Sequence, residues 1–240
     1  MFTRSESLRT FIQLYPVVSF IVAIQVVFWL LFSIPLSPLV LLFNLMDGYN
    51  AAIADGEYWR LLTPIILHAG LGHVFFNTIS LILFAPALEK ILKKSKFIIV
   101  YLGTGIFANI ATYLFEPLQY SHVGASGAIF GLFGVYLYMV LFRKEYIDQA
   151  NSQVVISILV IGVIMTFLNS NINIIAHLFG LIGGFLIAPL VLGKKERFMH
   201  QTFYNTQSRT RAVKQWKPKH LLWVILGFLI IVGALSQLAR

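Results

Sequence analysis

The sequence predicts an all-α membrane protein with seven transmembrane helices. Of its 240 residues, 58% are hydrophobic and 11% are charged, whereas soluble domains have about 45–50% apolar and about 25% charged residues. The apolar residues gather into segments that mostly reach the about 20 residues a helix needs to cross a bilayer. A helix also satisfies its own backbone hydrogen bonds in lipid. The segments are 13–34, 70–88, 97–115, 125–142, 154–170, 174–192 and 220–238.

The basic residues predict the orientation of these segments. If the N-terminus is cytoplasmic, all 18 lysines and arginines except Arg60 and Arg240 lie on the cytoplasmic side. Membrane proteins generally carry more basic residues in their cytoplasmic loops than in their external ones. The net charge of +9 is then expected to face anionic lipid headgroups, not nucleic acid. The first apolar segment is too long for a signal-peptide core and lacks a small-residue cleavage site, so we expect a retained helix.

Residues 35–60, between the first two apolar segments, differ from the other loops. They contain the apolar stretch 39–45, too short to span a membrane, and end in Tyr58, Trp59 and Arg60. An apolar stretch with Trp and Tyr beside it is typical of a segment lying in the membrane interface. The composition is equally compatible with an ordinary external loop.

Polar residues gather near the outer ends of three apolar segments. His68, His73 and Asn77 open the second segment, Ser126 begins the fourth and His177 lies near the start of the sixth. In the predicted orientation all three segments run inward, so these side chains reach one level below the outer surface. Polar and ionisable groups inside membrane segments are costly and point to function.

The residue types at this level fit nucleophilic catalysis. A serine hydroxyl becomes a good nucleophile when an adjacent base takes its proton, and histidine is the usual base near neutral pH. We therefore predict Ser126 as the nucleophile and His177 as its base. Donors for a developing oxyanion would be the Ser126 amide at a helix N-terminus and the side chains of His73 and Asn77.

Two stripes of small residues indicate how Ser126 and His177 could meet. Small residues on one helix face let another helix approach closely. If the two stripes pack together, Ser126 and His177 come within hydrogen-bond distance. One stripe is Gly127, Gly131 and Gly134, and the other follows His177 as Gly180 and Gly184.

Several kinds of chemistry are disfavoured. The chain has no cysteine, which excludes thiol catalysis. The fourth to sixth segments contain no Asp or Glu. We therefore expect a Ser–His dyad whose imidazole is held by packing, not an Asp-oriented triad. The fifth segment carries little of note beyond Thr166. The histidines of the second segment are five residues apart with no carboxylate between them, unlike a zinc-protease motif. No metal and no cofactor are expected.

Together these residues resemble the rhomboid family of intramembrane serine proteases, over the range from Tyr15 to Leu192. The matching motifs follow one another in the family's order and on the expected segments. The matching motifs are Trp59-Arg60, His68-x₄-His73-x₃-Asn77, Glu89, Gly124-x-Ser126-Gly127 and Ala176-His177-x₂-Gly180-x₃-Gly184.

The resemblance implies a catalytic arrangement. Ser126 would attack a peptide bond in or near the transmembrane segment of a substrate protein, with His177 acting as base and then as acid. His73, Asn77 and the Ser126 amide would form the oxyanion hole, with His68 close by. The fourth helix would start below the membrane surface in a water-filled cavity.

It also implies roles for residues around the site. Trp59 and Arg60 would anchor 35–60 as the membrane-lying first loop, and the fifth helix with the loop after it would be the gate. Phe130 takes the place of a tyrosine that stacks on the catalytic histidine in many relatives, which keeps the stacking and loses a hydroxyl.

The resemblance further implies a six-helix core plus one additional C-terminal transmembrane helix. The expected partners are transmembrane protein substrates and the lipid bilayer, with no nucleic acid and no metal, in a multi-pass protein of a bacterial cell membrane. The expected regions are 1–12 (cytoplasmic N-terminus), 13–192 (rhomboid six-helix protease core), 193–219 (basic cytoplasmic linker) and 220–240 (seventh transmembrane helix).

Two other functions remain open. One is a catalytically silent rhomboid-like protein that binds and escorts membrane proteins, although such proteins commonly lose the serine or histidine, and both are present here. The other is a channel or transporter with a histidine proton relay. That function leaves the Gly-x-Ser-Gly motif unexplained and predicts transmembrane acids that the sequence lacks.

Overall fold

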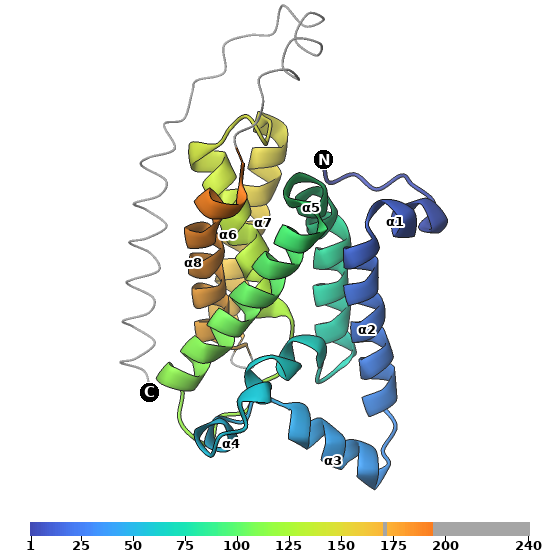
Figure 1. Ribbon diagram of the computed structural model, residues 1–240, viewed down its shortest axis with the longest axis vertical. Helices are drawn as coiled ribbons and strands as arrows, with labels where there is room; N and C mark the ends of the chain where they lie inside the picture. Colours follow the sequence, from blue (N-terminus) through green and yellow to red (C-terminus); the bar gives the residue numbers. More distant parts are fainter. Residues whose placement is uncertain (170–171, 194–240) are drawn as a thin grey trace, which may run out of the picture.

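The computed structural model describes residues 1–169 and 172–193 of the chain. Within these ranges every regular element is helical and no strand occurs. The elements are α1 (Leu8–Leu14), α2 (Pro16–Phe32), α3 (Ser37–Met46), α4 (Asn50–Ala54), the 3-10 turns η1 (Tyr58–Leu61) and η2 (Thr63–Ile66), α5 (Leu71–Phe115), α6 (Ser126–Phe142), α7 (Gln149–Leu168) and α8 (Ile174–Val191). Figure 1 shows α6, α7 and α8 side by side, with α2 against α5 and with α3 and α4 together at the lower end.

The apolar helices confirm an all-helical membrane protein. Among the described residues, α5, α7 and α8 are each long and apolar enough to cross a bilayer, and α1 with α2 makes a fourth span if this bent pair is counted as one. Each of the first six apolar segments coincides with a helix or with one arm of α5. The predicted helix 220–238 and residues 194–219 of the basic linker lie outside the described residues, so the count of six plus one stays a prediction.

Two helix boundaries differ from the sequence-based ones. The predicted segment 13–34 corresponds to α2, and a separate short helix, α1, lies mostly ahead of it and is bent from α2 by 114°. Pro16 opens α2, and proline favours a first helical position because it has no N–H to donate into a preceding turn. Helix α7 begins before residue 154, since the Asp148 side chain caps it by accepting a hydrogen bond from the Asn151 amide at 2.8 Å.

Helix α5 contains two of the predicted segments. Its backbone leaves the helical region at Lys93, where φ is 67°, and Figure 1 shows that the chain doubles back there. Just before this turn, Glu89 is buried and accepts hydrogen bonds from the amides of Val17 at 3.0 Å and Val18 at 2.9 Å. The Glu89 carboxylate thus caps the N-terminus of α2 and joins it to α5, a favourable place for a negative charge.

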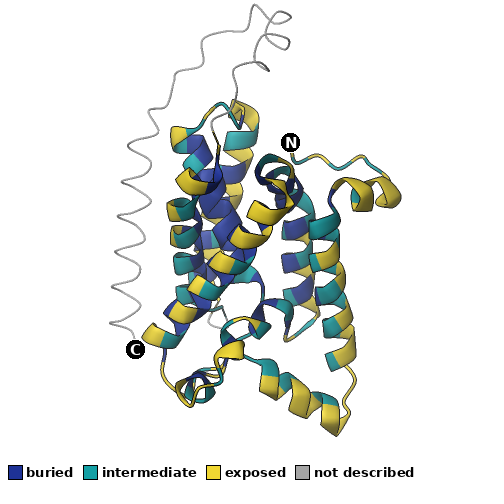
Figure 2. Ribbon diagram, in the orientation of Figure 1, coloured by how far each residue is buried: buried dark blue, intermediate teal, exposed yellow. Residues whose placement is uncertain are grey.

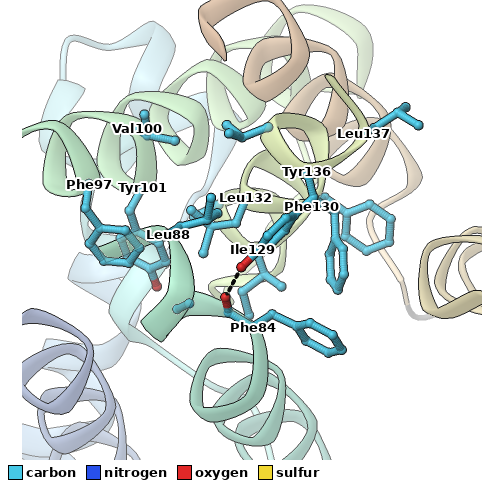
Figure 3. Packing of buried hydrophobic residues seen from close by; sticks show 14 of the residues in the cluster. Phe84, Leu88, Phe97, Val100, Tyr101, Ile129, Phe130, Leu132, Tyr136 and Leu137 are labelled. Carbon is cyan, nitrogen blue, oxygen red and sulfur yellow. Dashed lines mark hydrogen bonds between the residues drawn. The ribbon is translucent and has the colours of Figure 1, made fainter. Parts of the chain in front are cut away.

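Helix α6 is the centre of the bundle. Most of its residues are buried (Figure 2), as expected for a helix that is apolar on every side. Figure 3 shows its side chains Leu132 and Tyr136 packed among Leu88, Phe97 and other residues of α5. The Tyr136 hydroxyl donates a 2.6 Å hydrogen bond to the carbonyl of Phe84, which satisfies the one polar group of this buried ring.

The two glycine stripes pack against each other, as the sequence predicts. A methyl group placed on Gly180 would overlap the carbonyl oxygen of Gly127, and one on Gly184 would overlap that of Gly131. Gly134 in turn lies against the backbone of Leu181. Helices α6 and α8 are therefore in backbone-to-backbone contact, which only glycine permits.

The loop between α2 and α5 is fixed by the side chains of η1. Trp59 donates from Nε1 to the carbonyl of Leu45 at 3.0 Å. Arg60 is buried and donates from Nη1 to the Asn44 carbonyl at 2.7 Å and to the Asp47 carboxylate at 2.6 Å. Both side chains hold the end of α3, whose apolar residues are largely exposed, consistent with a segment that lies in the interface.

Candidate active site

Ser126 is the first residue of α6 and is partly buried. The turn before it depends on Gly124, which has a φ of 128°, a conformation that favours glycine. The Gly124 amide donates to the Pro64 carbonyl at 2.8 Å. No side chain in the described part of the chain caps the amides of this first turn of α6. The serine therefore lies at the positive end of a helix whose first amides are available to an acceptor.

His177 lies in the first turn of α8, and its position follows from the cap of that helix. The Asn173 side chain accepts a hydrogen bond from the Ala176 amide at 2.8 Å and so begins the helix. The imidazole is only 7% exposed. It stacks on the ring of Phe130, with centroids 4.1 Å apart and planes inclined by 18°.

The starts of α6 and α8 lie next to each other. A methyl group on Gly127 would be 3.4 Å from the Ala176 carbonyl oxygen, so the residue after Ser126 contacts the residue before His177. Phe130 follows Ser126 by one helical turn and covers the imidazole. No hydrogen bond joins Ser126 to His177 among the described residues, and in ligand-free enzymes such bonds are often long and tighten when substrate binds.

The start of α5 reaches the same region. The His73 ring lies against Gly124, where an added methyl group would come to 2.5 Å from Nε2. His68 and His73 pack edge to face with ring centroids 5.0 Å apart. Asn77 is buried and donates from Nδ2 to the His73 carbonyl at 3.0 Å. Its side-chain amide is therefore hydrogen-bonded within α5.

His68 is a buried histidine with unused hydrogen-bonding capacity. It is 3% exposed, and neither ring nitrogen has a partner among the described residues. No group of three or more His, Cys, Asp or Glu in the described ranges is arranged to hold a metal ion.

One contact of His177 was not predicted. Its Nδ1 lies 2.7 Å from the hydroxyl oxygen of Thr166 on α7, and that hydroxyl lies 2.7 Å from the Gly162 carbonyl. The sequence indicated only that Thr166 was the notable polar residue of an apolar segment. The i, i+4 spacing of Gly162 and Thr166 allows the contact between the Thr166 hydroxyl and the Gly162 carbonyl. No local sequence pattern indicated that Thr166 contacts His177.

The structure is that of an all-helical integral membrane protein. In it, close packing at glycines places the start of α6, which carries Ser126, against the start of α8, which carries His177. The Rhomboid domain model matches residues 55–194, and the chain belongs to the rhomboid family.

The chain is 59% identical over 197 residues to "Putative rhomboid protease YdcA" of Bacillus subtilis (strain 168), covering 82% of this chain and 99% of that protein. It is 42% identical over 139 residues to "Rhomboid protease GluP" of the same organism, covering 58% of this chain and 27% of that protein. A more distant relative is "Rhomboid-like protease 1" of Toxoplasma gondii, 30% identical over 203 residues, covering 78% of this chain and 69% of that protein.

Proposed function

We propose that this protein is an intramembrane serine endopeptidase that cleaves peptide bonds in or near the transmembrane segments of other membrane proteins. The observation that supports the proposal is the contact between the starts of α6 and α8. Gly127, which follows Ser126, lies against Ala176, which precedes His177, and Phe130 stacks on the buried His177 ring. The names of the relatives, which include rhomboid proteases of Bacillus subtilis, agree with this chemistry.

In the proposed reaction Ser126 and His177 act as a dyad. His177 takes the proton of the Ser126 hydroxyl as its oxygen attacks the scissile carbonyl, and then gives that proton to the leaving amine. A water molecule, activated by the same imidazole, hydrolyses the acyl-enzyme. Stacking on Phe130 limits the rotation of the imidazole and so keeps it available for both proton transfers.

The carbonyl oxygen becomes negative in the tetrahedral intermediate and needs hydrogen-bond donors. The free amides at the start of α6 are suited to this, because they are fixed and lie at the positive end of the helix dipole. His73, which touches Gly124, and Asn77 one turn further along α5 are the side-chain donors we propose. Asn77 would turn its amide from the His73 carbonyl toward the oxyanion, and His68 would support the His73 ring that it packs against.

The length of α6 supports a site below the membrane surface. Its 17 residues rise about 25 Å, less than the about 30 Å of a typical hydrocarbon core. Arg143 and Lys144 follow its C-terminus and fit a headgroup level, so Ser126 would lie several ångströms inside. With the N-terminus in the cytoplasm and 13–192 as the catalytic core, the site would open toward the outer face.

The test is cleavage of a fluorogenic transmembrane peptide by the full-length protein in liposomes. We expect turnover by the wild type and none by Ser126→Ala or His177→Ala at equal expression and folding. Cleavage that persists in Ser126→Ala would refute the proposed nucleophile. Binding of the peptide without turnover by the wild type would instead indicate an escort protein, and ion flux unaffected by Ser126→Ala a transporter.

A further inference from the structure

We propose that Thr166 is the positioning residue of the dyad, fixing His177 in the tautomer that carries its proton on Nδ1 and leaves Nε2 free as the base. This inference rests on the proposed function and adds to it a third residue, on α7. It replaces the expectation that packing alone holds the imidazole.

The first step concerns the Thr166 hydroxyl. Its oxygen is 2.7 Å from the Gly162 carbonyl oxygen and 2.7 Å from His177 Nδ1. Two oxygens at this separation need a hydrogen between them, and a carbonyl has none to give. The single hydroxyl hydrogen of Thr166 therefore points to Gly162.

The second step follows from the first. With its hydrogen committed, the Thr166 oxygen can only accept from the imidazole, so Nδ1 of His177 carries the proton. A neutral imidazole has one N–H, and Nε2 is then left with a lone pair. Because Thr166 occupies Nδ1, Nε2 is the ring nitrogen that can take the Ser126 proton.

The surroundings of the contact make it specific. Thr166 is 1% exposed, so water does not compete for the hydroxyl. The other buried residues of α7 are all valine or leucine, so Thr166 is the single polar group on the face by which this helix packs in the described structure. Gly162, one turn earlier, lies against Phe130, where an added methyl group would be 3.3 Å from the ring. Helix α7 thus contacts both partners of the stacked Phe130–His177 pair.

In a Ser–His–Asp triad a carboxylate holds the histidine in the correct tautomer and also stabilises the imidazolium. A neutral hydroxyl supplies the orientation and the tautomer but no negative charge. The Thr166 contact therefore positions the base without a charged group being buried in the bundle, where an uncompensated carboxylate is costly.

The test compares two substitutions of Thr166 with a matched control. Thr166→Val keeps the shape and removes the hydroxyl, whereas Thr166→Ser keeps the hydroxyl. The control is Thr104→Val, because Thr104 is equally buried and makes the same type of bond to its own helix, to the Val100 carbonyl at 2.7 Å, without a histidine.

We expect Thr166→Val to lower kcat about 10- to 100-fold, part of the usual contribution of a positioned general base, with little change in KM. Thr166→Ser and Thr104→Val should stay within about threefold of wild type. Wild-type kcat in Thr166→Val, or an equal loss in Thr104→Val, would overturn the proposal.

A spectroscopic readout separates this proposal from the proposed function. The ¹⁵N resonances of His177, assigned by comparison with His177→Ala, should show a protonated Nδ1 and an unprotonated Nε2 in the Ser126→Ala protein, which needs no turnover. Adding Thr166→Val should shift the ring toward a mixture of tautomers. A proton on Nε2 in the parent protein would refute the tautomer assignment even if Ser126 proves to be the nucleophile. Peptide cleavage by Ser126→Ala would refute the proposed nucleophile and leave the tautomer result intact.

Discussion

Replacing Gly180 by alanine should separate Ser126 and His177, the proposed catalytic residues, without changing either side chain. The added methyl carbon would overlap the Gly127 carbonyl oxygen and would lie 2.9 Å from its carbon and 3.2 Å from the Gly127 Cα. Carbon atoms pack best at about 3.5–4.0 Å. Because the overlap with the Gly127 carbonyl oxygen is the closest of these contacts, helices α6 and α8 would have to move apart by about 1 Å.

The consequences of that displacement can be estimated. A misplacement of about 1 Å in a catalytic site can lower the rate about 10²-fold, and overpacking of a well-packed core costs about 1–3 kcal/mol. We therefore expect Gly180→Ala to lower kcat by about 10- to 100-fold and to lower the thermal unfolding temperature in detergent. The assay is peptide cleavage in liposomes beside a melting curve.

Gly103→Ala is the matched control for this experiment. Gly103 also lies inside a helix, but nothing is within 4 Å of an added methyl group there. Alanine is the better helix former by about 0.5–1 kcal/mol, so Gly103→Ala should keep its activity and its stability. If Gly180→Ala cleaved the peptide at the wild-type rate, the close α6–α8 contact would not be what aligns Ser126 and His177.

Three further predictions concern stability. Glu89→Gln should lower the unfolding free energy by about 1–2 kcal/mol, because a neutral amide replaces the carboxylate that accepts from two amides of α2; thermal melting measures this, and an unchanged melting temperature would contradict it. Arg60→Lys should destabilise the protein and expose the first loop to protease, because a single ammonium cannot reproduce the separate bonds from Nε and Nη1; a proteolysis rate equal to wild type would count against that anchor. Burial lowers the pKa of His122 to about 4 from 6.5, so the unfolded chain takes up the proton first and stability should fall as the pH falls from about 6.5 toward about 4; His122→Gln should make this fall shallower, and an unchanged slope would show that His122 is not its source.

The sequence predicted the helices and one of their contacts for clear physical reasons. Apolar runs of membrane-spanning length leave the backbone little choice but a helix, and the glycine spacing on two of them predicted the contact between α6 and α8. The basic stretch between segments 70–88 and 97–115 correctly predicted a break in the chain, and the turn lies there, at Lys93. The bend at Pro16 was not predicted, because a long apolar run does not reveal where the chain bends.

The contact between Thr166 and His177 could not be predicted from local pattern. Helix α7 is apolar around most of its circumference, and in a membrane both lipid-facing and buried positions are apolar, so its sequence does not reveal which side packs inward. Ser126 and His177 could be proposed because a glycine stripe accompanied each of them, and Thr166 had no such marker.

The most direct test of a Ser126–His177 dyad is covalent labelling. The full-length protein in detergent is treated with a fluorophosphonate, which reacts with activated serines, and the adduct is located by peptide mass spectrometry. We expect modification at Ser126 in the wild type and none at that residue in His177→Ala. An adduct on a different serine, or labelling of Ser126 at the wild-type rate in His177→Ala, would contradict the claim that this histidine activates this serine.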